Sequence, residues 1–317
     1  MSLSTTAVSA GRVLFLQILF LFLCVATPRA LAGDAARSPA ENLRQLQALR
    51  AGYLYEELNW TVNAEFVPKP VRAKLTRLKH DLRDRIVAAM EQDADAEARP
   101  DAIKEAITLR FKKDGLTEHG REDYLRYARR FRVRAAEPPG HSELRSVILE
   151  IGIPVGYDSS LYIFSRRASG WGLVLSSEVN GYASVQEAQA FFDYKVSPSA
   201  ADGSWFVVTG SVNNYAVSAW QGLTYTAQVP SDDPERPRVM VREHHKICLF
   251  DFLGHEDKAF ELAPSVGEFR VSFPHEFAHE HGIAWVVDRF RIEDGRARKI
   301  SRECHFNRAR GRRIRCP

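Results

Sequence analysis

The chain has 317 residues, of which 45% are hydrophobic and 26% are charged, and its formal net charge is +4. These proportions exclude an intrinsically disordered protein, and the length leaves room for one large domain or two ordinary ones with a proper core. The charge is unevenly spread, because residues 296–317 hold nine Lys and Arg against one Glu.

The N-terminus carries the pattern of a secretory signal peptide. Arg12 precedes an apolar run over 13–26, and a small-residue Ala-Leu-Ala site follows at 30–32. A basic start, a short apolar centre and an A-x-A end are typical of a cleaved export signal, and the run is too short for a comfortable transmembrane helix. We expect residues 1–32 to be removed, which leaves a secreted or periplasmic protein with no membrane span.

Residues 33–136 are predicted to form a helical region. Ser38 and Glu41 make a capping box, with a proline at the first helical position between them. Apolar residues recur every three or four positions beyond it, as on the buried face of an amphipathic helix. The first predicted helix begins at Ser38, and three more are predicted over 70–90, 100–111 and 117–131.

After a linker at 137–140, residues 141–303 change to short β runs. Phe269, Val271 and Phe273 alternate with polar residues, as in a half-buried strand. We expect an α+β protein, with an N-terminal helical region followed by an antiparallel β-sandwich or barrel-like domain. Strands are predicted at 147–153, 161–166, 172–176, 191–196, 205–209, 223–229, 239–243, 247–252, 260–262, 269–273 and 283–292, with one short helix near 185–191.

The C-terminal residues 304–317 are predicted to form a basic tail closed by a disulfide. In an oxidising compartment Cys304 and Cys316 are the natural pair, and closing this loop contributes about 3 kcal/mol by restricting the unfolded chain. Cys248 lies in an apolar run and is interpreted as a buried free thiol. A bridge from Cys248 to either tail cysteine remains an alternative, because sequence does not fix connectivity.

One string resembles a catalytic motif. His275-Glu276-x-x-His279 resembles the H-E-x-x-H signature of zinc metallopeptidases, and His281 follows it. That resemblance implies two histidines one helical turn apart as zinc ligands, with Glu276 as the general base. Strand patterns on both sides leave too few residues for the long helix that such a site requires. We therefore interpret the string as a polar connector between strands, with an adventitious or regulatory metal site formed by His275, His279 and His281 as a further alternative.

Other features point to binding rather than to a particular reaction. His244 and His245 lie in a predicted strand, so their rings should point to opposite faces and cannot chelate together. The sequence contains no nucleophile elbow, phosphate-binding loop, dinucleotide fingerprint or calcium loop. The aromatic residues of the β half are more typical of sheet packing than of a sugar or peptide groove.

These observations predict an exported, non-enzymatic binding or envelope-associated protein. Its basic tail would contact an anionic envelope component or another protein, whereas export argues against nucleic acid as the partner. Alternatively, the tail is a partly disordered end, held by a disulfide, that only keeps the protein soluble. No cofactor is expected under this interpretation. The alternative function is a zinc metallopeptidase, with zinc held by His275 and His279.

Overall fold

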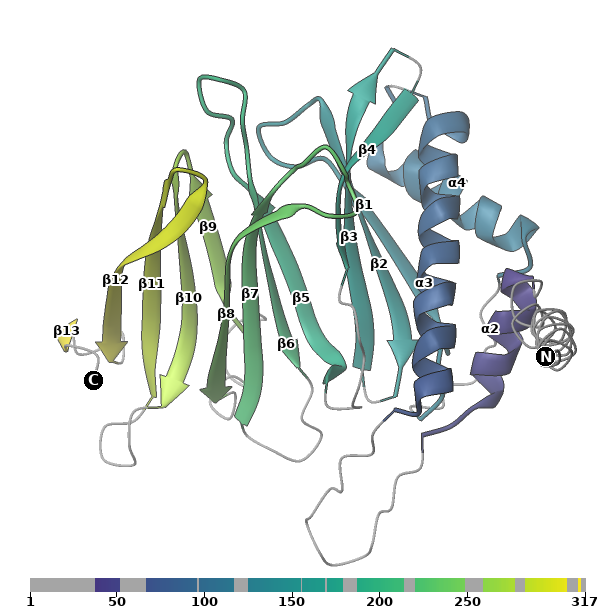
Figure 1. Cartoon of the computed structure of the whole chain (residues 1–317), viewed down its shortest axis with the longest axis horizontal. Helices are drawn as coiled ribbons and strands as arrows, with labels where there is room; N and C mark the ends of the chain where they lie inside the picture. The colour runs from purple at the N-terminus through teal and green to yellow at the C-terminus, as the bar shows by residue number, and fades with distance from the viewer. Residues whose placement is uncertain are drawn as a thin grey trace, which may run out of the picture.

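The computed structural model describes most of the chain beyond residue 37, and Figure 1 shows the whole chain. The predicted signal peptide lies outside the described residues. Nowhere in the described part is a helix both long and apolar enough to cross a membrane. The described residues are 38–51, 67–95, 97–116, 125–154, 156–168, 170–178, 187–213, 220–248, 259–276, 283–306 and 313–314.

Three α-helices form at the predicted places. The N–H of Glu41 donates to Oγ of Ser38 at 3.3 Å, as the capping box predicts, and each helix has a proline in its first turn. Their apolar faces are buried, most completely in the longest helix, where Leu78, Leu82 and Ile86 are 0% exposed. The elements are α2 (Pro39–Ala48), α3 (Lys69–Ala88), the π-helical turn η1 (Ala89–Asp93) and α4 (Pro100–Lys113).

The prediction of a fourth helix through Phe131 was wrong for its described part. Residues 125–130 form turns and an isolated bridge, and β1 (Phe131–Ala136) follows them. Val133 is buried while Arg132 and Arg134 are exposed, which is the alternation of a strand. Pairing with the next strand satisfies this backbone and overrides the weak helical spacing.

The larger sheet of the described residues has eight antiparallel strands. Their order is β1-β2-β3-β5-β6-β7-β8, and β4 pairs with β3 beside this path. The strands after β1 are β2 (Leu144–Ile153), β3 (Gly156–Arg167), β4 (Gly170–Glu178), β5 (Gln189–Val196), β6 (Val207–Asn213), β7 (Trp220–Val229) and β8 (Arg238–Cys248).

Both faces of this sheet are covered near β2, which is buried at all ten of its positions. Val147 and Leu149 belong to the core beneath the helices, whereas Ile148 belongs to a separate cluster with residues of β3 to β6. Alternate residues of a strand point to opposite faces, so the two clusters lie on opposite sides of the sheet. Consecutive apolar residues, as at 147–149, are expected in such a strand, although Arg145 and Glu150 are buried in it as well.

A second antiparallel sheet has five strands within the described residues, in the order β13-β12-β11-β10-β9. It packs against β6 to β8, away from the part of the large sheet that carries the helices (Figure 1). The core between the sheets is aromatic, with Phe269 and Phe290 stacked at 4.6 Å between ring centroids. The strands are β9 (Glu261–Ser265), β10 (Glu268–Glu276), β11 (Ile283–Glu293), β12 (Arg296–Phe306) and β13 (Arg313–Ile314). This arrangement confirms the predicted α+β class with two packed sheets.

Some boundaries differ from the sequence prediction. β12 was not predicted, and it extends the sheet to Phe306, so the first three residues of the predicted tail belong to a strand. The predicted strands over 239–243 and 247–252 form one strand, β8, which runs from Arg238 to Cys248. β5 already begins at Gln189, where the end of a short helix was predicted. β12 was missed because its many charged residues hide the alternation of apolar and polar positions that indicates a strand.

Candidate functional site

The candidate functional site is a group of charged side chains around Asp288, between the two sheets. Val286, Asp288 and Phe290 occupy successive inward positions of β11, so the strand places a carboxylate where its neighbours are core residues. Asp288 is 0% exposed. A carboxylate this deeply buried requires charged or hydrogen-bonding partners.

Asp288 receives those partners from β12 and β7. Arg302 donates from Nε to Oδ1 at 2.6 Å and from Nη2 to Oδ2 at 2.7 Å. Nζ of Lys299 lies 3.2 Å from Oδ2, and the hydroxyl of Tyr225 donates to the same oxygen at 2.9 Å. Burial alone raises the pKa of Asp288, but the Arg302 hydrogen bonds and Lys299 outweigh it and hold this pKa below its ordinary value.

A β-bulge in β12 places the side chains of Lys299 and Arg302 on the same side of the strand. Arg289 pairs with Ser301 and Phe290 pairs with Lys299, so Ile300 is left between them without a cross-strand partner. Lys299 and Arg302 are three positions apart and would face opposite sides of a regular strand. The extra residue Ile300 shifts the alternation of side chains by one position, so Lys299 and Arg302 both point at Asp288.

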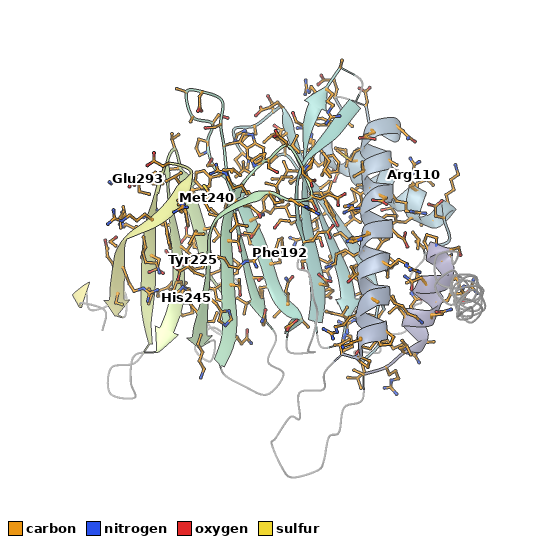
Figure 2. All side chains as sticks on the ribbon, in the orientation of Figure 1. Arg110, Phe192, Tyr225, Met240, His245 and Glu293 are labelled. Atoms are coloured by element: carbon orange, nitrogen blue, oxygen red, sulfur yellow. The ribbon has the colours of Figure 1, made fainter. Side chains whose placement is uncertain are left out.

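An aromatic stack lies next to the carboxylate. The His245 ring is stacked on Tyr225 at 5.4 Å and on Phe273 at 4.7 Å between centroids. Its Nε2 is 3.2 Å from the Tyr225 hydroxyl and 3.7 Å from Oδ2 of Asp288. Figure 2 shows Tyr225 and His245 together on neighbouring strands β7 and β8.

Burial shifts the pKa of both rings. It lowers the pKa of His245 to about 4, with Arg302 and Lys299 acting in the same direction and Asp288 acting against them. The pKa of the Tyr225 hydroxyl rises far above its usual value, first through burial and then through the charge of Asp288. At neutral pH the network therefore has a neutral imidazole, a neutral phenol and an ionised carboxylate.

This geometry suits a structural role better than a catalytic one. Both oxygens of Asp288 already accept hydrogen bonds, so the carboxylate has little capacity left to act as a base or a metal ligand. Among the described side chains that contact Asp288 there is no serine or cysteine. The network fastens β12, the strand that leads to the basic C-terminus, to β7 and β11.

The paired histidines behave as the sequence predicts. His245 points into the core, whereas His244 is exposed and its Nδ1 lies 3.0 Å from Oγ1 of Thr224. The importance of His245 was nevertheless missed. The sequence signal that could have revealed the network is Asp288, a carboxylate at an inward position of β11 between the apolar residues Val286 and Phe290.

The H-E-x-x-H residues are only partly described. His275 and Glu276 are the last two residues of β10 and pair with Ala284 and Ile283, so they lie in a strand. His279 and His281 lie outside the described residues. Zinc binding therefore stays a prediction, although a strand does not provide the helical face on which the motif depends. Within the described ranges, no three His, Cys, Asp or Glu residues are grouped so that they could hold a metal ion.

The predicted tail cysteines are also partly described. Cys304 is 1% exposed in the core between the sheets and takes part in a disulfide. Cys316 lies outside the described residues, so the pairing with Cys316 stays a prediction. The backbone of Cys248 ends β8, and its side chain is not described.

A second buried polar group lies between α3 and the large sheet. Nζ of Lys79 is 2.6 Å from Oδ2 of Asp158, with side chains 4% and 8% exposed. The Tyr162 hydroxyl donates to Glu178 at 3.0 Å beside this pair. Burial raises the pKa of Asp158 against the opposing effect of Lys79. This group fixes the long helix on the sheet.

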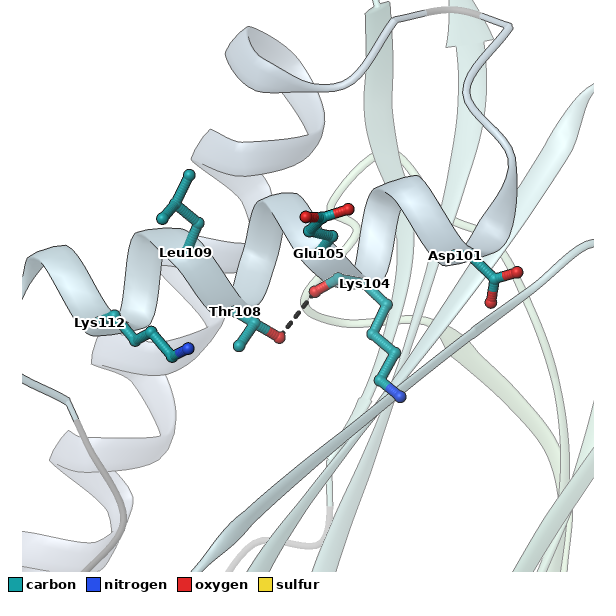
Figure 3. Close-up of a pocket in the computed structure, with 6 residues that line it drawn as sticks. All are labelled: Asp101, Lys104, Glu105, Thr108, Leu109 and Lys112. Carbon is teal, nitrogen blue, oxygen red and sulfur yellow. Dashed lines mark hydrogen bonds between the residues drawn. The ribbon is translucent and has the colours of Figure 1, made fainter.

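A shallow hollow on the outer face of α4 is lined by exposed side chains (Figure 3). Thr108 donates its hydroxyl hydrogen to the carbonyl of Lys104 at 2.7 Å within the same helix. Opposite charges alternate along this face, as on a solvated helix. The described lining residues are Asp101, Lys104, Glu105, Thr108, Leu109 and Lys112.

Comparisons with protein-family models, with curated proteins and with solved structures gave no match to this chain.

Proposed function

We propose that this protein is an exported, non-enzymatic binding protein that attaches to an anionic partner, either an envelope component or another protein, through its basic C-terminal segment. β12 leads into that segment, and the outer face of the second sheet carries arginines from β10, β11 and β12. The positions of the arginines on this face support the proposal.

Arginines stand directly opposite one another on the solvent side of the second sheet. Arg270 pairs across the strands with Arg289, and Arg291 pairs with Arg298. Like charges in such positions destabilise a sheet. An arrangement that carries this cost favours a surface whose charge is neutralised by a partner.

Acidic neighbours offset only part of this charge. Arg291 contacts Glu268 at 2.9 Å and Arg289 contacts Glu303 at 3.4 Å. Arg298 has no ion pair with any residue of the described chain. On the inner side of β12, Lys299 and Arg302 are balanced by Asp288 and Glu243. The arginines on the outer side of β12 are therefore the ones that a partner could contact.

The test is binding of the mature chain to vesicles of phosphatidylcholine with and without phosphatidylglycerol. We expect binding only to the anionic vesicles, with an affinity that falls steeply as salt rises from 0.05 to about 0.5 M, because the screening length shrinks below about 5 Å. Neutralising Arg308, Arg310, Arg312 and Arg313 to Gln keeps Cys316 and should weaken binding.

The matched control removes the same charge elsewhere. Substituting Lys104, Lys112, Lys113 and Arg236 by Gln changes the net charge equally but leaves the C-terminal segment intact. Equal losses in the two quadruple variants, or binding that does not depend on salt, would contradict the role of the segment.

A further inference from the structure

Five arginines form one connected row across the outer face of the second sheet. Arg289 and Arg291 lie two positions apart on β11 and share its outer face. Arg289 pairs with Arg270 of β10, and Arg291 pairs with Arg298 of β12. Arg296 extends the row by two positions along β12. With the usual spacing of strands and residues, the row is about 17 Å long. We call these five side chains the arginine row.

Carboxylates lie along the arginine row on both sides. Glu268 of β10 pairs with Arg291 on one side of the row. On the same side, Glu293 of β11 pairs with Arg296 (Figure 2). Glu303 of β12 lies beyond the other side of the row. The positive charge is therefore confined to a narrow stripe with acidic margins. A flat anionic surface would bring its charges against these carboxylates, whereas a single anionic chain can follow the stripe.

Three members of the row have no ion pair within the described part of the chain. They are Arg270, Arg296 and Arg298, and all three are exposed. The other two, Arg289 and Arg291, pair with surface carboxylates while 42% and 50% of their side chains stay exposed. Ion pairs this exposed are weak, so an anion can join or replace the carboxylate. A partner can therefore reach unbalanced guanidinium groups without any change in the core.

The row can recognise a partner only through its side chains. β10 and β11 each pair with a strand on both sides, so their backbone groups are used within the sheet. A guanidinium fork binds a carboxylate through two parallel hydrogen bonds. A chain whose carboxylates are fixed on rigid rings loses less conformational freedom on binding than an acidic peptide, whose carboxylates lie on rotatable stems. These requirements favour an anionic sugar chain.

We propose that the arginine row binds a single chain of an acidic polysaccharide that carries one carboxylate on each sugar. The chain follows the row from Arg296 to Arg270, and its carboxylates accept hydrogen bonds from successive guanidinium groups. This inference rests on the proposed function in taking the partner to be anionic. It goes beyond that function by giving the second sheet a ligand of its own, separate from the contact made by the C-terminal segment.

The test is calorimetric titration of the full mature chain with oligogalacturonates, from the dimer to the octamer, at a fixed ionic strength. We expect saturable binding whose affinity rises with length until the oligomer spans the row, because each added sugar reaches another arginine. Arg298→Gln should weaken binding of the octamer about tenfold, since it removes one charge-assisted contact. Arg298→Lys should restore only part of this loss, because the charge returns without the fork.

Two further variants separate the row from general charge. Glu268→Gln removes the carboxylate that competes for Arg291 and should tighten binding, a gain that a folding defect does not produce. Arg236→Gln removes one exposed positive charge from the connection between β7 and β8 and should leave the affinity unchanged. Equal losses in Arg236→Gln and Arg298→Gln, or no saturable binding by the parent chain, would overturn the proposal.

Two other probes distinguish the polysaccharide from other anionic partners. Poly-L-glutamate of matched length should bind more weakly than the oligogalacturonate, and equal affinity would assign the row to an acidic peptide instead. Arg298→Gln should weaken binding to anionic vesicles far less than binding to the octamer, and equal losses would assign the row to a membrane surface.

The C-terminal segment provides the comparison with the proposed function. Its quadruple variant should lose vesicle binding but keep the oligogalacturonate affinity of the parent chain. Failure of vesicle binding and failure of oligogalacturonate binding are therefore independent results.

Discussion

Arg302 binds Asp288 through both Nε and Nη2, at 2.6 and 2.7 Å, inside the core between the two sheets. Of the two side chains only that of Arg302 reaches solvent, with 36% of its surface exposed. The pair couples a core position of β11 to a strand whose other face is basic. Stability of the sandwich and presentation of the basic surface therefore depend on the same contact.

Asp288→Asn should destabilise the protein by about 3 kcal/mol, because Arg302 loses its buried carboxylate partner and Lys299 keeps only Glu243. Urea unfolding measures this change. Glu303→Gln breaks the exposed pair with Arg289 and should cost less than about 1 kcal/mol. Similar losses of stability in the two variants would show that the buried contacts of Asp288 stabilise the protein no more than a surface ion pair does.

His245 should make stability depend on pH. Burial lowers its folded pKa to about 4, against an ordinary value of 6.5, so the unfolded chain binds the proton more readily. The free energy of unfolding should therefore fall as the pH is lowered from about 6.5 to about 4. Unfolding curves across this window measure the slope.

The adjacent histidine provides the control for this slope. His245→Gln should flatten the dependence on pH, whereas His244→Gln should leave it unchanged because that ring is exposed. A slope that survives in His245→Gln would assign the titration to other groups. Asp288 adds a further loss of stability below about pH 4, because its lowered pKa means that its contribution disappears only in acid.

The buried pair of Lys79 and Asp158 should be sensitive to removal of one partner. Lys79→Met leaves an unpaired carboxylate beneath α3 and should cost about 3–5 kcal/mol. The double variant with Asp158→Asn removes both charges and should recover most of that loss. Thermal and urea unfolding of the three proteins measure the coupling, and a double variant no more stable than the single one would disprove it.

Export should yield a protein that begins at Gly33. The small-residue site at 30–32 predicts cleavage after Ala32. Intact mass of the secreted form, compared with the full-length chain, measures the cleavage site. Retention of the apolar run over 13–26 in the exported protein would contradict the prediction.

The sequence determined much of the architecture. The capping box at Ser38, the proline-initiated helices and the alternation of Phe269, Val271 and Phe273 are local signals, and each forms the predicted element. Local spacing also placed His244 and His245 on opposite faces of a strand. These predictions hold because a side chain's direction in a helix or strand depends on short-range backbone geometry.

Only the tertiary structure decided which residues meet. Asp288, Tyr225 and His245 come from three strands, and no spacing in the sequence links them. The bulge at Ile300 turns Lys299 and Arg302 to one side, whereas a regular strand would separate them. The arginine row likewise combines residues of three strands. Such contacts depend on the register and packing of distant segments, which a single sequence does not specify.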